Sequence, residues 1–211
     1  MSAHELLEEL RRELEPIERA IRAHRYLAAP PPEESVRVFA GEQYTILSAD
    51  RRSFAHLAAR FPKRPAGDFF LGLARGEGEA LARLLRLADS LGLDGDALAA
   101  YEPNPGCQVY TAFVAWLALN GSRAELALAF LANLAAWGEN CRQLAGLLPG
   151  HYDTSFFEFF AEPEPGFEDQ ALAAADQGLA AGDSPQRARR AARLLQAYEL
   201  MFWDTLADAL Q

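Results

Sequence analysis

The stretch SPQRARRAARLLQAYELMFWDTLADAL, residues 184–210, decides the fold class of this chain. Ser184 is a good helix cap, and Pro185 suits the first turn of a helix. Beyond them apolar residues recur at intervals of three and four, so that they form one stripe along a helix, with charged side chains on the other side. The stripe consists of Ala192, Leu195, Glu199, Phe202, Leu206 and Ala209.

Proline and glycine divide the rest of the chain into segments of helical length. No segment shows the alternation of apolar and polar residues that a strand requires. Ser122 followed by Glu125 has the spacing of a capping box at the start of one segment. We therefore predict an all-α protein, folded as a single domain over residues 1–211. Helices are expected over residues 4–26, 33–61, 67–91, 108–119, 122–147, 167–181 and 185–210, with short pieces before residue 102 and within 155–160.

Charge and composition narrow the classes of function. The chain has 20 Lys and Arg residues against 30 Asp and Glu residues, which gives a formal net charge of −10. Such a surface disfavours phosphates and anionic lipids, so we expect neither nucleic acid nor a membrane as a partner. No apolar run approaches the roughly 20 residues that span a bilayer, and the N-terminus lacks the apolar core of a signal peptide. We expect a cytoplasmic protein whose two cysteines, Cys107 and Cys141, are packed thiols.

Four of the expected helices carry polar residues in line with their apolar stripes. Burying an unpaired polar group costs up to several kcal/mol, so each of these residues must find a partner. Separate structural hydrogen bonds are one explanation, such as a buried Arg or Tyr partner for Glu199. A shared polar pocket explains all of them at once. The polar residues are Gln43 and Asp50 with Glu42 beside them, Glu77, Asn133 and Glu199; aromatic walls are expected from Tyr110, Trp137, Phe156 and Phe202.

Four segments, taken in order along most of the chain, resemble the TenA family. They are HRYL (24–27), GEQYTIL (41–47), VYTAF (109–113) and YELMFWD (198–204), of which the last is the most specific. The resemblance implies a heme-oxygenase-like helical bundle with an internal pocket, a fold that the TenA family shares with thiaminase II and pyrroloquinoline-quinone synthase.

The resemblance also assigns roles to individual residues. Glu199 matches the family's catalytic carboxylate, which acts as proton donor and acceptor on a bound aminopyrimidine. Tyr110 matches a residue that lines the pocket. The family's pyrimidine-anchoring aspartate falls at Glu42 or Gln43, and the flanking residues fit both registers.

The nucleophile of the family is not retained. The thiaminase cysteine precedes an aromatic residue by four positions, and the matching pair in this chain is Asn133 with Trp137. The chain therefore resembles the branch of the family that lacks this cysteine. The resemblance to that branch implies that carboxylates act on degraded thiamin pyrimidines. Because Asn133 cannot act as a nucleophile, we expect water to take that role in this chain, activated by Glu199 or by a second carboxylate.

Three functions remain open from the sequence. The first is a hydrolase of thiamin salvage that splits a C–N bond of an aminopyrimidine, and the second is a non-catalytic protein that binds the same kind of molecule. The third is a diiron oxidase of the same fold, although no histidine has the Glu-x-x-His spacing with an inward glutamate. We expect no cofactor, no metal and a homo-oligomer, dimeric or tetrameric. The candidate site comprises Glu199 as catalytic residue and Glu42, Gln43, Glu77, Tyr110, Asn133, Trp137 and Phe202 as substrate-binding residues.

Overall fold

The computed structural model describes residues 1–209 of the chain. Within that range it contains α-helices, one short 3₁₀ helix and no strand, so the all-α prediction is confirmed. The elements are α1 (Ala3–Arg22), η1 (Arg25–Leu27), α2 (Glu33–Arg60), α3 (Ala66–Ser90), α4 (Gly95–Ala99), α5 (Pro105–Asn120), α6 (Arg123–Leu147), α7 (Ser155–Ala161), α8 (Phe167–Ala180) and α9 (Pro185–Asp208).

The helix boundaries follow the caps that the sequence contains. Ser122 and Glu125 form a capping box at the start of α6, and Ser184 caps α9 with Pro185 in its first turn. The helix expected from residue 108 begins at Pro105 instead, because proline is tolerated in a first turn where no backbone N–H is needed. The predicted end of the last helix, Leu210, lies outside the described residues.

The first helix is shorter than expected and ends at Arg22 rather than at residue 26. His24 caps the 3₁₀ helix that follows, since its Nδ1 accepts a hydrogen bond from the backbone N–H of Tyr26. The Nε2 atom of His24 lies 3.0 Å from Oδ1 of Asp204 on α9. The HRYL segment therefore joins the end of α1 to the last helix.

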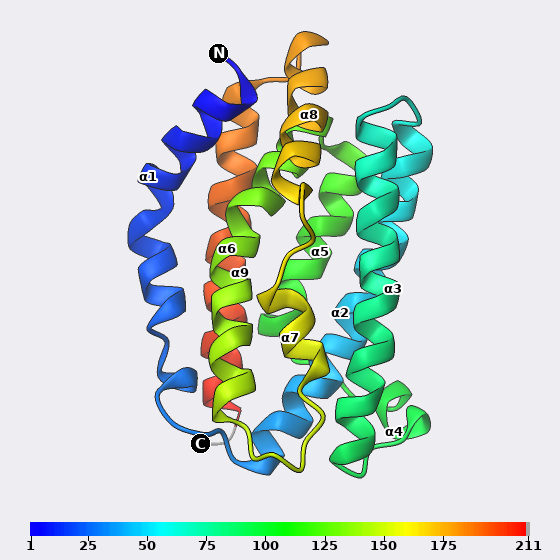
Figure 1. Cartoon of the computed structure of the whole chain (residues 1–211), viewed down its shortest axis with the longest axis vertical. Coiled ribbons are helices and arrows are strands. Elements are labelled where there is room, and N and C mark those ends of the chain that lie inside the picture. The colour runs from blue at the N-terminus through cyan, green and yellow to red at the C-terminus, as the bar shows by residue number, and fades with distance from the viewer. Residues whose placement is uncertain (210–211) are drawn as a thin grey trace.

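The long helices run side by side along the longest axis of the molecule (Figure 1). α2 and α3 form an antiparallel pair on one side, and they make the most extensive contact between any two helices. α1 lies on the opposite side, with α5, α6 and α9 between. α7 and the segment that joins it to α8 cross in front of the gap between α6 and α3 (Figure 1). Among residues 1–209, no helix combines the length and apolar composition of a membrane-spanning segment.

The buried apolar side chains form two clusters. One contains Leu7, Phe54 and Phe70, and the other contains Phe39 and Trp203. Full burial of a Leu or Phe side chain contributes about 1.5–3 kcal/mol each, so both clusters stabilise the bundle. The helices α2, α3, α5, α6 and α9 each contribute to both clusters.

Candidate functional site

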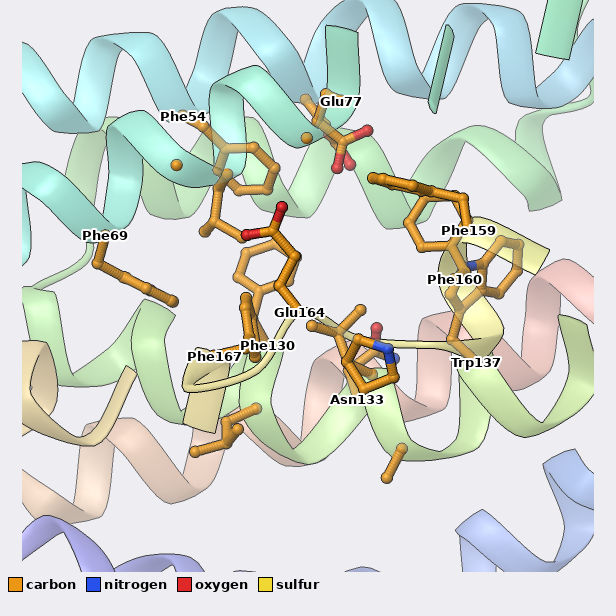
Figure 2. A pocket seen from close by; sticks show the side chains of 18 of the residues that line it. Phe54, Phe69, Glu77, Phe130, Asn133, Trp137, Phe159, Phe160, Glu164 and Phe167 are labelled. Atoms are coloured by element: carbon orange, nitrogen blue, oxygen red, sulfur yellow. The ribbon is translucent and has the colours of Figure 1, made fainter. Parts of the chain in front are cut away.

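A cavity of about 680 Å³ lies among α2, α3, α5, α6 and α9. This volume is in the range typical of small-molecule sites. Aromatic rings from α2, α6 and α7 surround it, and Figure 2 shows Phe54, Phe130, Trp137, Phe159 and Phe160 around the open space. The cavity therefore offers flat apolar walls to a planar ligand.

Each of the five helices packs into one apolar cluster along part of its length and into the other cluster along the rest. Each carries a polar residue between these two parts, and these polar residues line the cavity. On α9, for example, Leu195 belongs to the first cluster and Phe202 to the second, with Glu199 between them. The same arrangement places Asp50 on α2, Glu77 on α3, Tyr110 on α5 and Asn133 on α6, and all five polar residues line the cavity.

Glu199 is held by hydrogen bonds on both carboxylate oxygens. Its side chain is buried, with 2% of its surface exposed. Nε1 of Trp203, one turn further along α9, donates to Oε1 at 3.2 Å, and Nδ2 of Asn133 donates to Oε2. Oδ1 of Asn133 in turn accepts a hydrogen bond from the hydroxyl of Tyr110 at 3.0 Å. The orientation of the carboxylate is thus fixed by α6 and α9 together.

The same environment changes the acidity of Glu199. Burial raises the pKa of the carboxyl group to about 8, and the hydrogen bonds from Trp203 and Asn133 oppose this rise without cancelling it. A carboxyl group whose pKa lies close to neutral exchanges a proton readily at physiological pH. Glu199 is therefore suited to act as a general acid and base.

A further group of polar side chains supports Asn133 from the side of α1. Nδ2 of Asn133 also lies 3.3 Å from Oε1 of Gln196, whose Nε2 donates to the carbonyl oxygen of Ala132 at 3.2 Å and to Glu18 at 3.5 Å. Glu18 pairs with Arg22 at 3.3 Å near the surface. These contacts set which end of the Asn133 amide faces Glu199.

Asp50 and Glu77 form a carboxyl pair on the α2 and α3 side of the cavity. Thr111 donates a hydrogen bond to Asp50, but burial still raises the pKa of Asp50 to about 7. Burial, followed by the negative charge of Asp50, raises the pKa of Glu77 well above its usual value. Burial and then the charges of Asp50, Glu199 and Glu77 raise the pKa of Tyr110, so this phenol lies within electrostatic reach of all three carboxyl groups.

Most of the residues predicted from the sequence meet at this cavity, and two do not. The residues Gln43, Glu77, Tyr110, Asn133, Trp137, Glu199 and Phe202 all line it. Phe156 does not line it and packs instead against Phe39, with ring centroids 5.9 Å apart. Glu42 does not line it either, so of the two registers considered for the second helix only Gln43 faces the cavity.

Glu42 has a structural role that the sequence pattern did not indicate. It is fully buried and accepts hydrogen bonds from the hydroxyl of Tyr101 at 2.9 Å, from the backbone and side chain of Asn104 at 2.7 and 2.8 Å, and from Gln108 at 2.6 Å. Gly41 makes this possible, because a Cβ atom there would lie 2.5 Å from the Tyr101 ring. Glu42 therefore fastens the connection between α4 and α5 to α2.

Asp50, which the sequence placed among the inward polar residues, also lines the cavity, seven residues after Gln43 on the same helical stripe. One further lining residue was not indicated by the sequence. Glu164 belongs to the connection between α7 and α8, and Figure 2 shows its carboxylate directed towards the cavity. That connection has no helical periodicity, so no pattern could indicate where it runs.

Neither cysteine lines the cavity. Cys107 and Cys141 are buried and unpaired. Burial raises the pKa of both thiols, which keeps them protonated. Within residues 1–209, no group of three or more His, Cys, Asp or Glu side chains could hold a metal ion.

Comparisons with known proteins agree with this fold. The model of the TENA/THI-4/PQQC family matches residues 11–209. A TenA homologue from Pyrococcus horikoshii OT3 is similar in structure, with a TM-score of 0.80 and 20% identity over 95% of this chain and 97% of that one. A TenA homologue from Pyrococcus furiosus gives a TM-score of 0.76 and 21% identity over 95% of this chain and 99% of that one.

One structurally similar protein is described by its fold class. A domain of unknown function with a heme oxygenase-like fold, from Shewanella denitrificans OS217, matches with a TM-score of 0.65 and 11% identity over 99% of this chain and 90% of that one. The predicted heme-oxygenase-like fold is thereby confirmed. No curated protein matches the chain in sequence.

Proposed function

We propose that this chain, which belongs to the TENA/THI-4/PQQC family, binds a thiamin-derived aminopyrimidine in its cavity and hydrolyses a C–N bond of that molecule. The observation that carries the proposal is Glu199, a buried carboxyl group that lines the cavity with its pKa raised to about 8. At neutral pH this group is mostly protonated, so it can give a proton to a leaving nitrogen.

Water is the nucleophile in this proposal. Asn133 stands where the resemblance places the cysteine of thiaminases, and an amide cannot attack carbon. Water attacks the carbon while the C–N bond breaks, and the electron pair of that bond goes to nitrogen, which takes the proton of Glu199. The attacking water then returns a proton to the carboxylate, so that an alcohol leaves together with ammonia, or with formamide from an N-formyl derivative, and Glu199 is restored.

The walls of the cavity fit a flat heteroaromatic ring. Trp137 and Phe202 line the cavity beside Glu199, with ring centroids 6.0 Å apart and planes inclined at 67°. Tyr110 and Asn133 complete the polar side. A ring held between these aromatic walls can place its exocyclic nitrogen near the carboxyl group of Glu199.

The test is to supply the aminopyrimidine and its N-formyl derivative to the purified protein. Alcohol formation is followed by chromatography and binding by calorimetry. The proposal predicts many turnovers per protein molecule and saturable binding. Binding without turnover would instead identify a non-catalytic binding protein, and the absence of both would overturn the assignment of the cavity to this class of molecule.

A further inference from the structure

We propose that Asp50 and Glu77 form a cation site within the cavity, which binds a protonated nitrogen group of the ligand while Gln43 hydrogen bonds with a neutral part of it. This inference deepens the proposed function, and it rests on that function only for the premise that the cavity receives a small organic molecule. It adds that the ligand carries a positive charge at a place distinct from the nitrogen that Glu199 protonates.

The two carboxyl groups have free hydrogen-bonding capacity directed at the cavity. Glu77 extends from α3 into the open space, across from Asn133 on α6 (Figure 2). No residue in the described range 1–209 makes a hydrogen bond or ion pair with the side chain of Glu77. Asp50 accepts a hydrogen bond from Thr111 on Oδ1, and no described residue donates to its second oxygen.

Gln43 is a second and independent indication that this part of the cavity binds a polar group of a ligand. Its side chain is only 4% exposed, it lines the cavity, and its amide has no hydrogen-bond partner among residues 1–209. Buried side-chain amides are satisfied in most proteins, so an unpaired one facing a cavity indicates a ligand group. Gln43 and Asp50 share one face of α2 at a separation of about 10 Å, which a small two-ended molecule can span.

The charged groups around the cavity favour a cationic ligand over an anionic one. Eight carboxyl groups and two guanidinium groups line it, and five of the carboxyl groups are exposed at its mouth. Glu79 is paired with Arg83, and Glu168 is paired with Arg11, one of the two guanidinium groups. The ionised carboxylates are those exposed at the mouth, and they repel a phosphate or carboxylate group and attract a cation. A cation bound beside Asp50 and Glu77 favours the ionised form of these two groups. The carboxyl groups belong to Asp50, Glu77, Glu79, Glu162, Glu164, Glu168, Asp169 and Glu199.

The surroundings favour an organic cation over a metal ion. Within the described residues, Asp50 and Glu77 have no third ligand of the kind that a metal requires. Aromatic rings flank the pair instead, and Figure 2 shows Phe54 and Phe159 on either side of Glu77. A planar amidinium or arylammonium group can form charge-assisted hydrogen bonds with the carboxylates while its flat faces contact the rings.

The test compares a cationic probe with a neutral one of the same shape. Benzamidine carries an amidinium group and benzamide carries a neutral amide, and calorimetry at pH 7 measures the affinity of both. We expect benzamide to bind about 10- to 100-fold more weakly, as the loss of a charge-assisted hydrogen bond predicts. Asp50→Asn and Glu77→Gln should each remove this preference, whereas Asp89→Asn, an exposed carboxylate on α3, should retain it.

Gln43 is tested with a longer probe. Gln43→Leu should weaken the binding of 4-aminobenzamidine, which has a second polar end, by more than it weakens that of benzamidine. Thermal unfolding of each variant shows whether it is folded, and Asn at position 50 can still accept the hydrogen bond from Thr111.

The inference is overturned if the wild-type protein binds both probes equally, if the Asp50 and Glu77 variants keep the preference, or if Mg²⁺ or Mn²⁺ stabilises the protein and benzamidine does not. These outcomes are separate from the turnover assay. A protein that prefers benzamidine but does not hydrolyse the aminopyrimidine retains the cation site and loses the hydrolase assignment.

Discussion

Asn133 on α6 donates a hydrogen bond from Nδ2 to Oε2 of Glu199 on α9. The residue at the position of the expected nucleophile thus positions the carboxyl group that we propose as the acid and base. Because its Oδ1 is occupied by the hydroxyl of Tyr110, the Asn133 amide cannot turn over without breaking that contact. In this chain the polar contacts of the cavity converge on the carboxyl group of Glu199.

Removing this donor should change the acidity of Glu199. The hydrogen bond from Asn133 lowers the pKa of the carboxyl group, so Asn133→Ala should raise that pKa above about 8. The measurement is the pH dependence of kcat, whose alkaline limb should move to higher pH. Asn120→Ala on the exposed end of α5 is the control. An unchanged pH profile would show that Asn133 does not set the acidity of the site.

Glu42→Ala should destabilise the protein. The substitution leaves the partly buried donors of Tyr101, Asn104 and Gln108 without their acceptor. Unpaired buried donors cost about 1–3 kcal/mol each, and partly buried donors lie at the lower end of this range, so we expect a loss of roughly 3 kcal/mol in the free energy of unfolding. Urea unfolding measures this loss, with Glu139→Ala as the control, since this partly exposed side chain of α6 pairs with Arg142 at the surface. A loss no larger than that of the control would contradict the structural role of Glu42.

The stability of the protein should fall as the pH rises from 5 to 8. Burial raises the folded-state pKa of Asp50 from 3.8 to about 7 and that of Glu199 from 4.5 to about 8. Between these values the folded state binds more protons than the unfolded state, so raising the pH favours unfolding.

Asp50→Asn removes one of these groups and isolates its effect. The variant should melt at roughly the wild-type temperature at pH 5 and about 4–8 °C higher at pH 8, which corresponds to about 2 kcal/mol in a domain of this size. Asp89→Asn controls for the change in net charge. Equal slopes of melting temperature against pH in Asp50→Asn and the wild type would contradict the buried state of Asp50.

Neither cysteine should be needed for turnover. Cys107 and Cys141 are buried and do not line the cavity, and burial raises the pKa of each thiol. We expect Cys107→Ala and Cys141→Ala to keep kcat within about twofold of the wild type, and iodoacetamide to label the native protein slowly. Fast inactivation by iodoacetamide, or loss of turnover in a variant that remains folded, would identify a thiol in the chemistry.

The sequence predicts the helices well because the residues that begin and end each helix act locally. Caps such as Ser122 and Ser184, and breaks at proline and glycine, act within one turn of the chain. Polar residues of the cavity could also be predicted from the sequence, since Glu77 and Glu199 interrupt apolar stripes at helical spacing.

The sequence does not indicate which elements that are distant along the chain contact one another. Glu42 and Gln43 are neighbours on α2, and only the packing of Tyr101 and Asn104 against α2 decides that Glu42 is satisfied while Gln43 faces the cavity. Glu164 reaches the cavity because the connection between α7 and α8 crosses its front, a path that no periodicity encodes.

The most direct test of the role proposed for Glu199 compares ligand binding with turnover in the Glu199→Gln variant. Glutamine has nearly the same shape but cannot donate an acidic proton, so we expect the aminopyrimidine to bind with an affinity within about threefold of the wild type while kcat falls by about 10²–10⁴. Glu139→Gln should match the wild type in both quantities. A folded Glu199→Gln variant that turns the aminopyrimidine over at the wild-type rate would contradict the central role assigned to Glu199.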